Sequence, residues 1–364
     1  MTPADLSRTV ALAVCGAVER GELPAVPEVR VVVERSRPGG RGEYASNVAL
    51  RLAKGARRAP GEVAELLRDA LVAVPGIAAV EITPPGFLNF TLHPDDGLAA
   101  RVREQGLRYG HGDALAGREV LCPGGDELRG RVYGEVLAGL VRAQGGTPVP
   151  GGSGPAPLRR QDGVDVERRL GAEATRWGIL DTPAKETPAF TSGLLRQHED
   201  NPLFRVRYAH SRARALLRNA ADLGFGPAAT APDAQPEAPA TTVPDAQPAA
   251  PATTAPDARP EAPAAGTAPA DRLPAPPGPA ALLRALAEYP LVLEAAAHHR
   301  APDRLTRHLV TIADALLDVQ HDVLPLGDEK PSVAHRSRLA VAEAAGTVLA
   351  GGLSLLGIDA PESL

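Results

Sequence analysis

Apolar residues recur every three to four positions along several stretches, which is the spacing of one buried helix face. In residues 3–20 these positions are occupied by Leu6, Val10, Val14 and Val18. The same spacing predicts further helices over residues 48–54, 61–74, 128–143, 166–180, 201–222, 280–288, 291–299, 305–323 and 332–356. Helices should therefore dominate the second half of the chain.

Short runs rich in β-branched and aromatic residues predict strands. They cover residues 29–33, 77–82, 87–92 and 119–122. The sequence Pro84-Pro85-Gly86 predicts a turn between two of them, and the Gly/Pro-rich residues 145–163 predict a loop. Mixed helices and strands indicate an α+β unit over residues 1–110.

Residues 226–279 have a composition that cannot build a core. They hold 15 of the 37 Pro residues and repeat a proline motif with a twelve-residue period. Because Pro lacks a backbone donor and the repeat has no apolar face, a disordered, partly polyproline-II insert is predicted. The helices on its two sides then predict an all-α bundle over residues 176–364.

The formal net charge of −5 is unevenly distributed. Six acids and two arginines in residues 226–279 account for −4 of it. Residues 30–60 carry eight basic groups and two acids, whereas residues 201–220 carry five arginines and no acid. Two basic segments on a near-neutral body indicate a polyanionic partner.

Other protein classes are disfavoured. Cys15 and Cys122 form neither a disulfide framework nor a metal-binding spacing. His298, His299 and His308 have no suitably spaced carboxylate or thiol beside them, so no metal is expected. No run approaches the about 20 apolar residues of a membrane span, and the first residues do not resemble a signal peptide. A cytoplasmic protein is predicted.

Three stretches resemble the arginyl-tRNA synthetase family. Residues 42–50, GEYASNVAL, are similar to its GDYATN-AL segment, and PGFLNF follows at residues 85–90. Residues 201–212, NPLFRVRYAHSR, are similar to NPVFYVQYAHAR. The C-terminus, with GLSLLG at residues 352–357 and APESL at residues 360–364, resembles the family's ending.

The resemblance implies three units. Residues 1–110 match the α+β N-terminal domain that faces the D-loop of tRNA. Residues 111–175 match a short, truncated remnant of the Rossmann-type catalytic domain. Residues 176–364 match the all-α, DALR-type anticodon-binding bundle, here interrupted by the Pro/Ala-rich insert.

The resemblance also implies two sets of tRNA-contacting residues. The anticodon set is Arg205, Arg207, Tyr208, His210, Arg212, Arg214 and Arg218. The D-loop set is Arg41, Tyr44, Ser46, Asn47, Arg51, Phe87 and Asn89. Structural alternatives are a solvated arginine face, core packing of Tyr208 with Phe204, and capping of the following helix by Ser46 or Asn47.

The chemistry of amino-acid activation is missing from the sequence. It requires donors at the ATP phosphates, which the HIGH and KMSKS motifs supply in this family. No His lies between His111 and His198, and only Lys185 lies between Lys54 and Lys330. No catalytic residues are therefore assigned, and no cofactor is expected.

These observations predict a tRNA-binding protein, with arginine tRNA as the first candidate, that does not charge its tRNA. One alternative is an arginine–tRNA ligase, which would use ATP, with residual activity or activity completed by a partner. Another is a protein-interaction module without RNA. A full-length synthetase is a candidate protein partner.

Overall fold

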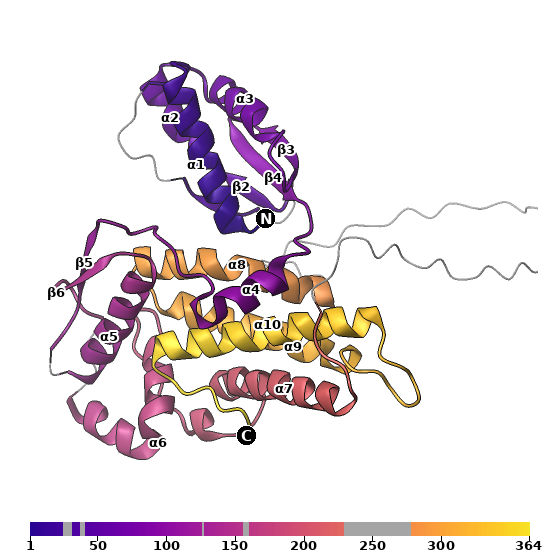
Figure 1. The fold of residues 1–364 in the computed structure, drawn as a ribbon. Helices are drawn as coiled ribbons and strands as arrows, with labels where there is room; N and C mark the ends of the chain where they lie inside the picture. The colour runs from indigo at the N-terminus through magenta and orange to yellow at the C-terminus, as the bar shows by residue number, and fades with distance from the viewer. Residues whose placement is uncertain (25–30, 37–40, 126, 156–159, 229–277) are drawn as a thin grey trace, which may run out of the picture.

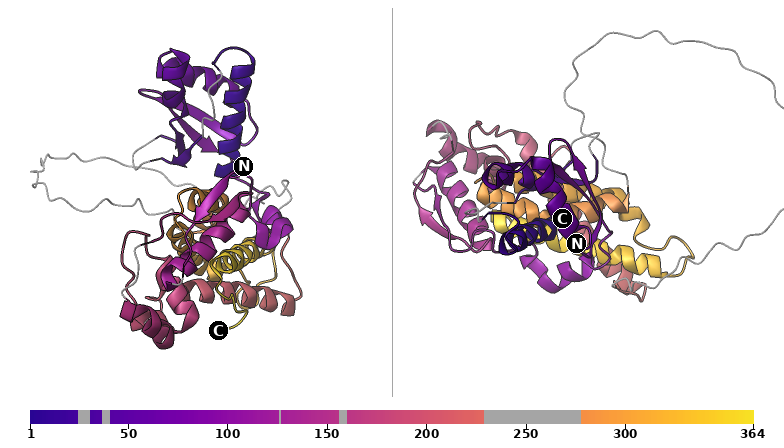
Figure 2. Two further views of the ribbon diagram at one scale, coloured as in Figure 1. Left: turned by 90° about the vertical axis from the view of Figure 1, so that its left-hand side faces the viewer. Right: turned by 90° about the horizontal axis from the view of Figure 1, so that it is seen from above.

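The computed structural model describes residues 1–24, 31–36, 41–125, 127–155, 160–228 and 278–364 (Figure 1). These residues form an N-terminal part and a larger helical part, each with its own hydrophobic core. The N-terminal part stands on one side of the helical part in Figure 1 and in the left view of Figure 2. Most of the predicted insert lies in residues 229–277, outside the described residues, so its disorder stays a prediction.

The N-terminal part is a four-stranded antiparallel sheet covered by three helices. Its strands, in spatial order, are β1 (Val33–Arg35), β2 (Tyr44–Ser46), β4 (Phe87–Leu92) and β3 (Ile77–Thr83). The helices are α1 (Pro3–Glu19), α2 (Val48–Ala56) and α3 (Pro60–Leu71). They cover the face toward which Leu88 and Phe90 point, so the opposite face of the sheet is open.

Local sequence signals explain most of these elements. A capping box between Thr2 and Asp5 begins α1, and Pro60 occupies the first turn of α3. The strands predicted at residues 77–82 and 87–92 are confirmed. The strand predicted at residues 29–33 begins only at Val33, with residues 25–30 outside the described residues. β2 was not predicted, because three residues are too few to show a periodicity.

The second hydrophobic core also includes residues that precede residue 110, the predicted end of the first unit. Leu98 and Val102, on α4 (Leu98–Gln105), belong to the second core, where α4 packs on α10 (Val333–Leu356). A 3-10 turn, Gly106–Arg108, follows α4. Residues 119–180 share this core as well, so the predicted second and third units pack as one body. An amphipathic pattern predicts which face of a helix is buried, but it does not predict which hydrophobic core that face joins.

One parallel βαβ unit lies at the edge of the helical part. β5 (Glu119–Cys122) pairs with β6 (Thr147–Pro150), and α5 (Leu128–Ala143) connects them. The prediction of a loop over residues 145–163 was wrong at β6, because β5 pairs with a strand that contains two prolines. Gly134 allows α5 to approach the end of β5, since a Cβ there would lie 1.8 Å from the Pro123 carbonyl oxygen.

Five long helices build the rest of the helical part. They are α6 (Arg160–Leu180), which is interrupted by a non-helical residue at Gly171, α7 (Pro202–Asp222), α8 (Pro279–His298), α9 (Asp303–Val319) and α10. Two 3-10 turns, Ser192–Leu195 and Gln320–Asp322, lie between them. The predicted break between residues 288 and 291 was wrong, because α8 continues through Pro290. Packing on α9 and α10 stabilises α8 across the lost hydrogen bond.

Helix α10 is long and apolar enough to cross a membrane by length and composition alone. This corrects the expectation that no such run exists. Its most apolar window is 67% buried inside the fold, where it packs against α7, α9 and α4. The apolar residues of α10 therefore serve the core of this part.

Three rings stack in the second core. Tyr289 lies between Tyr109 and His308, with ring centroids 6.0 and 6.3 Å away. The Tyr109 hydroxyl donates to the Leu286 carbonyl oxygen, whereas the fully buried Tyr289 hydroxyl has no partner among the described residues. A buried polar group without a partner costs about 1–3 kcal/mol.

Replacing Tyr289 with Phe should therefore leave the free energy of unfolding unchanged or raise it by about 1 kcal/mol. Tyr109→Phe is the matched control and should lower it by about 1 kcal/mol, because it removes a formed hydrogen bond. Urea unfolding of the two variants distinguishes them. Equal destabilisation by both would show that the Tyr289 hydroxyl has a partner.

Candidate nucleic-acid interface

Helix α7 carries the predicted anticodon set. Asn201 caps it by accepting from the Leu203 backbone N–H, and Pro202 occupies its first turn. Its buried face packs against α9 and α10. The buried residues are Leu203, Val206, Ala209, His210, Ala213, Leu216 and Ala220.

Three of the five arginines are held by the protein itself. Arg205 Nη1 lies 3.1 Å from Asp314 of α9, and Arg207 Nη1 lies 3.0 Å from Glu173 of α6. Arg212 Nε donates to Gln320 Oε1 at 2.7 Å. These side chains are half-buried and connect α7 to its neighbours.

Arg214 and Arg218 remain on the exposed face of α7. Arg214 Nη2 lies 2.9 Å from Glu362, with both side chains largely exposed to solvent. An exposed pair of this kind is worth at most about 1 kcal/mol, so Arg214 can exchange it for another anion. Arg218 makes no ion pair with the part of the chain that the structure describes.

Two aromatic rings form a platform on the same face. The Tyr208 ring is 41% exposed and stacks on Phe204, with centroids 5.7 Å apart and planes 16° from parallel. Positions 204, 208, 211, 214 and 218 follow each other at three- and four-residue spacing. The platform and both exposed arginines therefore share one helix face.

His210 lies under the C-terminal segment and is only 5% exposed. Its Nδ1 is 3.0 Å from the Pro361 carbonyl oxygen, which can only accept, so Nδ1 carries the proton. Burial lowers the pKa of His210 below its usual range. The Ser211 hydroxyl donates to the Glu362 carbonyl oxygen. Both side chains hold the last residues of the chain against α7.

The open sheet face of the N-terminal part contains a hollow of about 470 Å³. Alternation along β2 and β4 points Ala45, Phe87 and Asn89 to this face. The Asn89 amide nitrogen donates to Glu81, Thr83 and Phe87, which leaves its Oδ1 as an acceptor. The hollow is lined by Val32, Glu34, Arg35, Ser36, Ala45, Ser46, Asn47, Thr83, Phe87 and Asn89.

The D-loop set is only partly brought together. Ser46 is buried, and its hydroxyl donates to Val32 and accepts from the Val48 N–H, which is a structural role at the start of α2. Asn47 is exposed, and its side chain does not cap α2. Arg41 is exposed beside Glu81 at 3.0 Å, and Arg51 is exposed on α2.

Tyr44 is elsewhere. It is only 4% exposed, and its hydroxyl donates to Glu288 of α8 at 3.2 Å. Sequence reasoning missed Thr83, which lines the hollow. The strand alternation that places Phe87 and Asn89 on one face would have identified Thr83 as their cross-strand neighbour. Among the described residues, no group of three His, Cys, Asp or Glu side chains could hold a metal ion.

Two family models match the chain at its two ends. Residues 6–92 match the arginyl tRNA synthetase N terminal domain, and residues 265–364 match the DALR anticodon binding domain. Residues 6–92 cover the sheet with the hollow. The second match includes α8, α9 and α10, which pack with α7 in the helical part.

Curated relatives match part of the chain. An arginine–tRNA ligase of Frankia alni is 50% identical over 113 residues, which is 30% of this chain and 20% of the relative. One of Micrococcus luteus is 40% identical over 162 residues, which is 40% of this chain and 29% of the relative. The matches thus span less than a third of these relatives' length.

Solved structures share the fold. The arginyl-tRNA synthetases of Thermus thermophilus and Plasmodium falciparum superpose with TM-scores of 0.58 and 0.59, at 14% and 8% identity. The first alignment covers 100% of both chains, and the second covers 100% of this chain and 99% of the other. With both domain models and these relatives in agreement, the chain belongs to the arginyl-tRNA synthetase family.

Proposed function

We propose that this chain binds tRNA through α7 and through the open sheet face, without activating an amino acid itself. The exposed Tyr208–Phe204 platform beside Arg214 and Arg218 carries this proposal. Unpaired bases stack on aromatic rings, and arginines bind the phosphates between them. Aromatic rings and arginines on one helix face are therefore suited to binding the bases and phosphates of the anticodon loop.

The open sheet face would bind a second part of the tRNA, the D-loop. Phe87 offers a ring for stacking, and the amides of Asn47 and Asn89 offer donors and acceptors for a base edge. A basic stripe extends from the hollow along α2. Asn47, Arg51 and Lys54 are spaced by four and three residues, and all are exposed. We assign this stripe to phosphate contacts.

The N-terminus of α5 supports a protein that does not charge tRNA. Glu127 caps this helix by accepting from the Gly130 N–H at 2.8 Å. The carboxylate occupies the helix end at which a phosphate would otherwise be favoured, and it repels a triphosphate. We interpret residues 111–175 as the remnant of the catalytic domain, between an N-terminal unit (1–110) and an anticodon-binding unit (176–364).

Ligase activity is the second candidate, because the curated relatives are arginine–tRNA ligases. Arginine-dependent ATP–pyrophosphate exchange distinguishes the candidates. We expect no exchange by the purified chain, alone or with tRNA. Exchange above the level of an enzyme-free control would make the chain a ligase. Exchange in a mixture with a full-length synthetase that exceeds the exchange of that synthetase alone would identify a protein partner. From the tRNA-binding role, we also propose that the chain lies in the cytoplasm.

Titration with fluorescent tRNA tests the main proposal. We expect tighter binding to arginine tRNA than to an unrelated tRNA. Affinity should fall steeply between about 50 and 200 mM salt, because phosphate contacts release counterions. Equal, salt-insensitive binding of both tRNAs, or no binding, would refute a specific tRNA-binding role and favour a protein-interaction module.

A further inference from the structure

The N-terminal part rests directly on α8 of the helical part (Figure 1, Figure 2). Four charged side chains of alternating sign cross this contact. They are Arg35 and Glu43 from the sheet side, and Glu288 and Arg284 from α8. With Tyr44 they form what we call the interdomain cluster. It is formally neutral, so each charge has a partner of opposite sign.

Strand register explains one half of the interdomain cluster. Arg35 on β1 and Tyr44 on β2 are cross-strand partners, so their side chains point to the same face of the sheet. Both contact Glu288: the Tyr44 hydroxyl donates to Oε1 at 3.2 Å, and Arg35 Nε lies 3.5 Å from the same atom. Glu288 thus contacts two strands at once, accepting a hydrogen bond from Tyr44 and forming an ion pair with Arg35.

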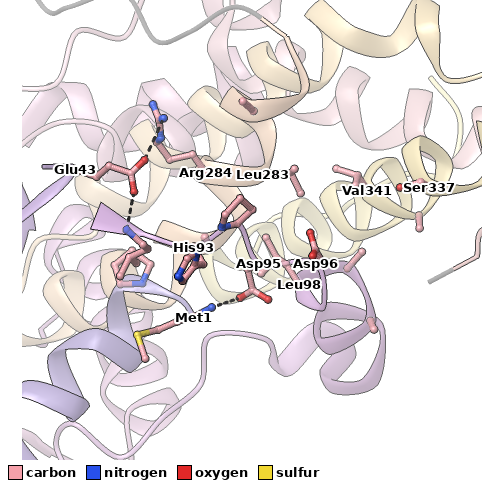
Figure 3. Close-up of a pocket in the computed structure, with 18 of the residues that line it drawn as sticks. Met1, Glu43, His93, Asp95, Asp96, Leu98, Leu283, Arg284, Ser337 and Val341 are labelled. Atoms are coloured by element: carbon pink, nitrogen blue, oxygen red, sulfur yellow. Dashed lines mark hydrogen bonds and ion pairs between the residues drawn. The ribbon is translucent and has the colours of Figure 1, made fainter. Parts of the chain in front are cut away.

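Helical spacing explains the other half. Arg284 precedes Glu288 by one turn of α8, so the two residues share a helix face. Arg284 Nη2 lies 3.8 Å from Glu43 Oε1, and Glu43 Oε2 also accepts from the Leu92 N–H (Figure 3). One turn of α8 therefore contacts Arg35 of β1, Tyr44 of β2 and Glu43, which directly precedes β2.

Packing beside the interdomain cluster is incomplete. A cavity of about 300 Å³ lies between the two parts next to it, bordered by Glu43 and His93 of the N-terminal part and by Leu283 and Val341 of the helical part (Figure 3). An open cavity contributes little packing energy, so the interdomain cluster, together with the packing of α1 on α8, sets the orientation of the N-terminal part.

We propose that Glu288 is a positioning residue. By holding the N-terminal part on α8, it fixes the distance between α7 and the hollow on the open sheet face. This inference rests on the proposed tRNA binding. The two RNA-binding surfaces belong to different cores, and a partner that contacts both binds best when their separation is set in advance. In this chain, direct docking of the sheet on α8 sets that separation.

A distance measurement tests the positioning role without RNA. Cys15 on α1 is exposed and Cys122 is buried, so a spin label reacts at the former. A second label at Thr311→Cys, an exposed position on α9, reports the separation of the two parts. We expect one narrow distance distribution that broadens in Glu288→Arg, where three cations meet.

Glu104→Arg is the matched control, because Glu104 is exposed on α4 and the charge change is the same. It should leave the distribution narrow. Tyr44→Phe, which removes only one hydrogen bond, should broaden it less than Glu288→Arg and serves if the latter does not fold. A narrow, unshifted distribution in whichever of these two cluster variants folds would overturn the inference.

RNA binding supplies the second readout. Glu288→Arg should weaken binding of whole tRNA about ten-fold, because the linked surfaces lose part of their effective concentration. Its affinity for an isolated anticodon stem-loop should stay within two-fold of the original. An equal loss for both RNAs would mean that Glu288 acts on α7 itself. If the unmodified chain binds no tRNA, the proposed function fails while the distance measurement still decides the role of Glu288.

Discussion

Replacing Arg214 and Arg218 with Glu should weaken tRNA binding about 100-fold at low salt. Each arginine supplies a charge-assisted hydrogen bond, and at about 1.5 kcal/mol for each bond, the lower end of the usual range, the loss of two gives this factor. The plot of log affinity against log salt has a negative slope. The magnitude of this slope should decrease by about 1.5, because two phosphate contacts are lost. Fluorescence titration at several salt concentrations measures both quantities.

Arg131→Glu with Arg142→Glu is the matched control. Both arginines are exposed on α5, away from α7, and the change in net charge is identical. The control should keep most of the affinity. Equal losses in both double variants would reveal a nonspecific charge effect and remove α7 from the interface. Arg207 is a poorer target, since Glu at this position would face Glu173 and destabilise the helix packing.

Lowering the pH from 7 to 5 should cost the helical part about 2 kcal/mol of stability through His308. Its imidazole is buried and donates from Nε2 to the Ala285 carbonyl oxygen at 2.8 Å. Burial lowers the pKa of His308 from 6.5 to about 4. The unfolded chain therefore takes up a proton as pH falls through about 6.5, whereas the folded chain does so only near about 4.

Between about pH 6.5 and pH 4, the free energy of unfolding decreases by about 1.4 kcal/mol for each pH unit. Above this range, His308 does not change the stability. Burial lowers the pKa of His111 and His210 as well, so both act in the same direction. Urea unfolding followed by the fluorescence of Trp177, the single tryptophan, reports this core.

His308→Gln keeps a donor for Ala285 but cannot titrate. It should be less stable at pH 7 and lose about 2 kcal/mol less on acidification than the unmodified chain. The same pH dependence in both proteins would contradict the assignment to His308.

Local patterns predicted the elements of this protein well where they were long. The helices at α5 and α7 and the hairpin of β3 and β4 follow from periodicity, caps and turn residues. Patterns failed at β2, which is too short to show a period, and at β6 and Pro290, where neighbouring elements outweigh an unfavourable local residue.

The sequence by itself determined the family, the two basic segments and the loss of the activation motifs, because these depend on residue identity and order. Only the tertiary structure decided which side chains remain for RNA. Arg205, Arg207 and Arg212 have partners on α6, α9 and the 3-10 turn that follows α9, far away in sequence, and Tyr44 meets Glu288 across 244 residues. Burial and pairing arise from contacts between distant segments, which no local pattern records.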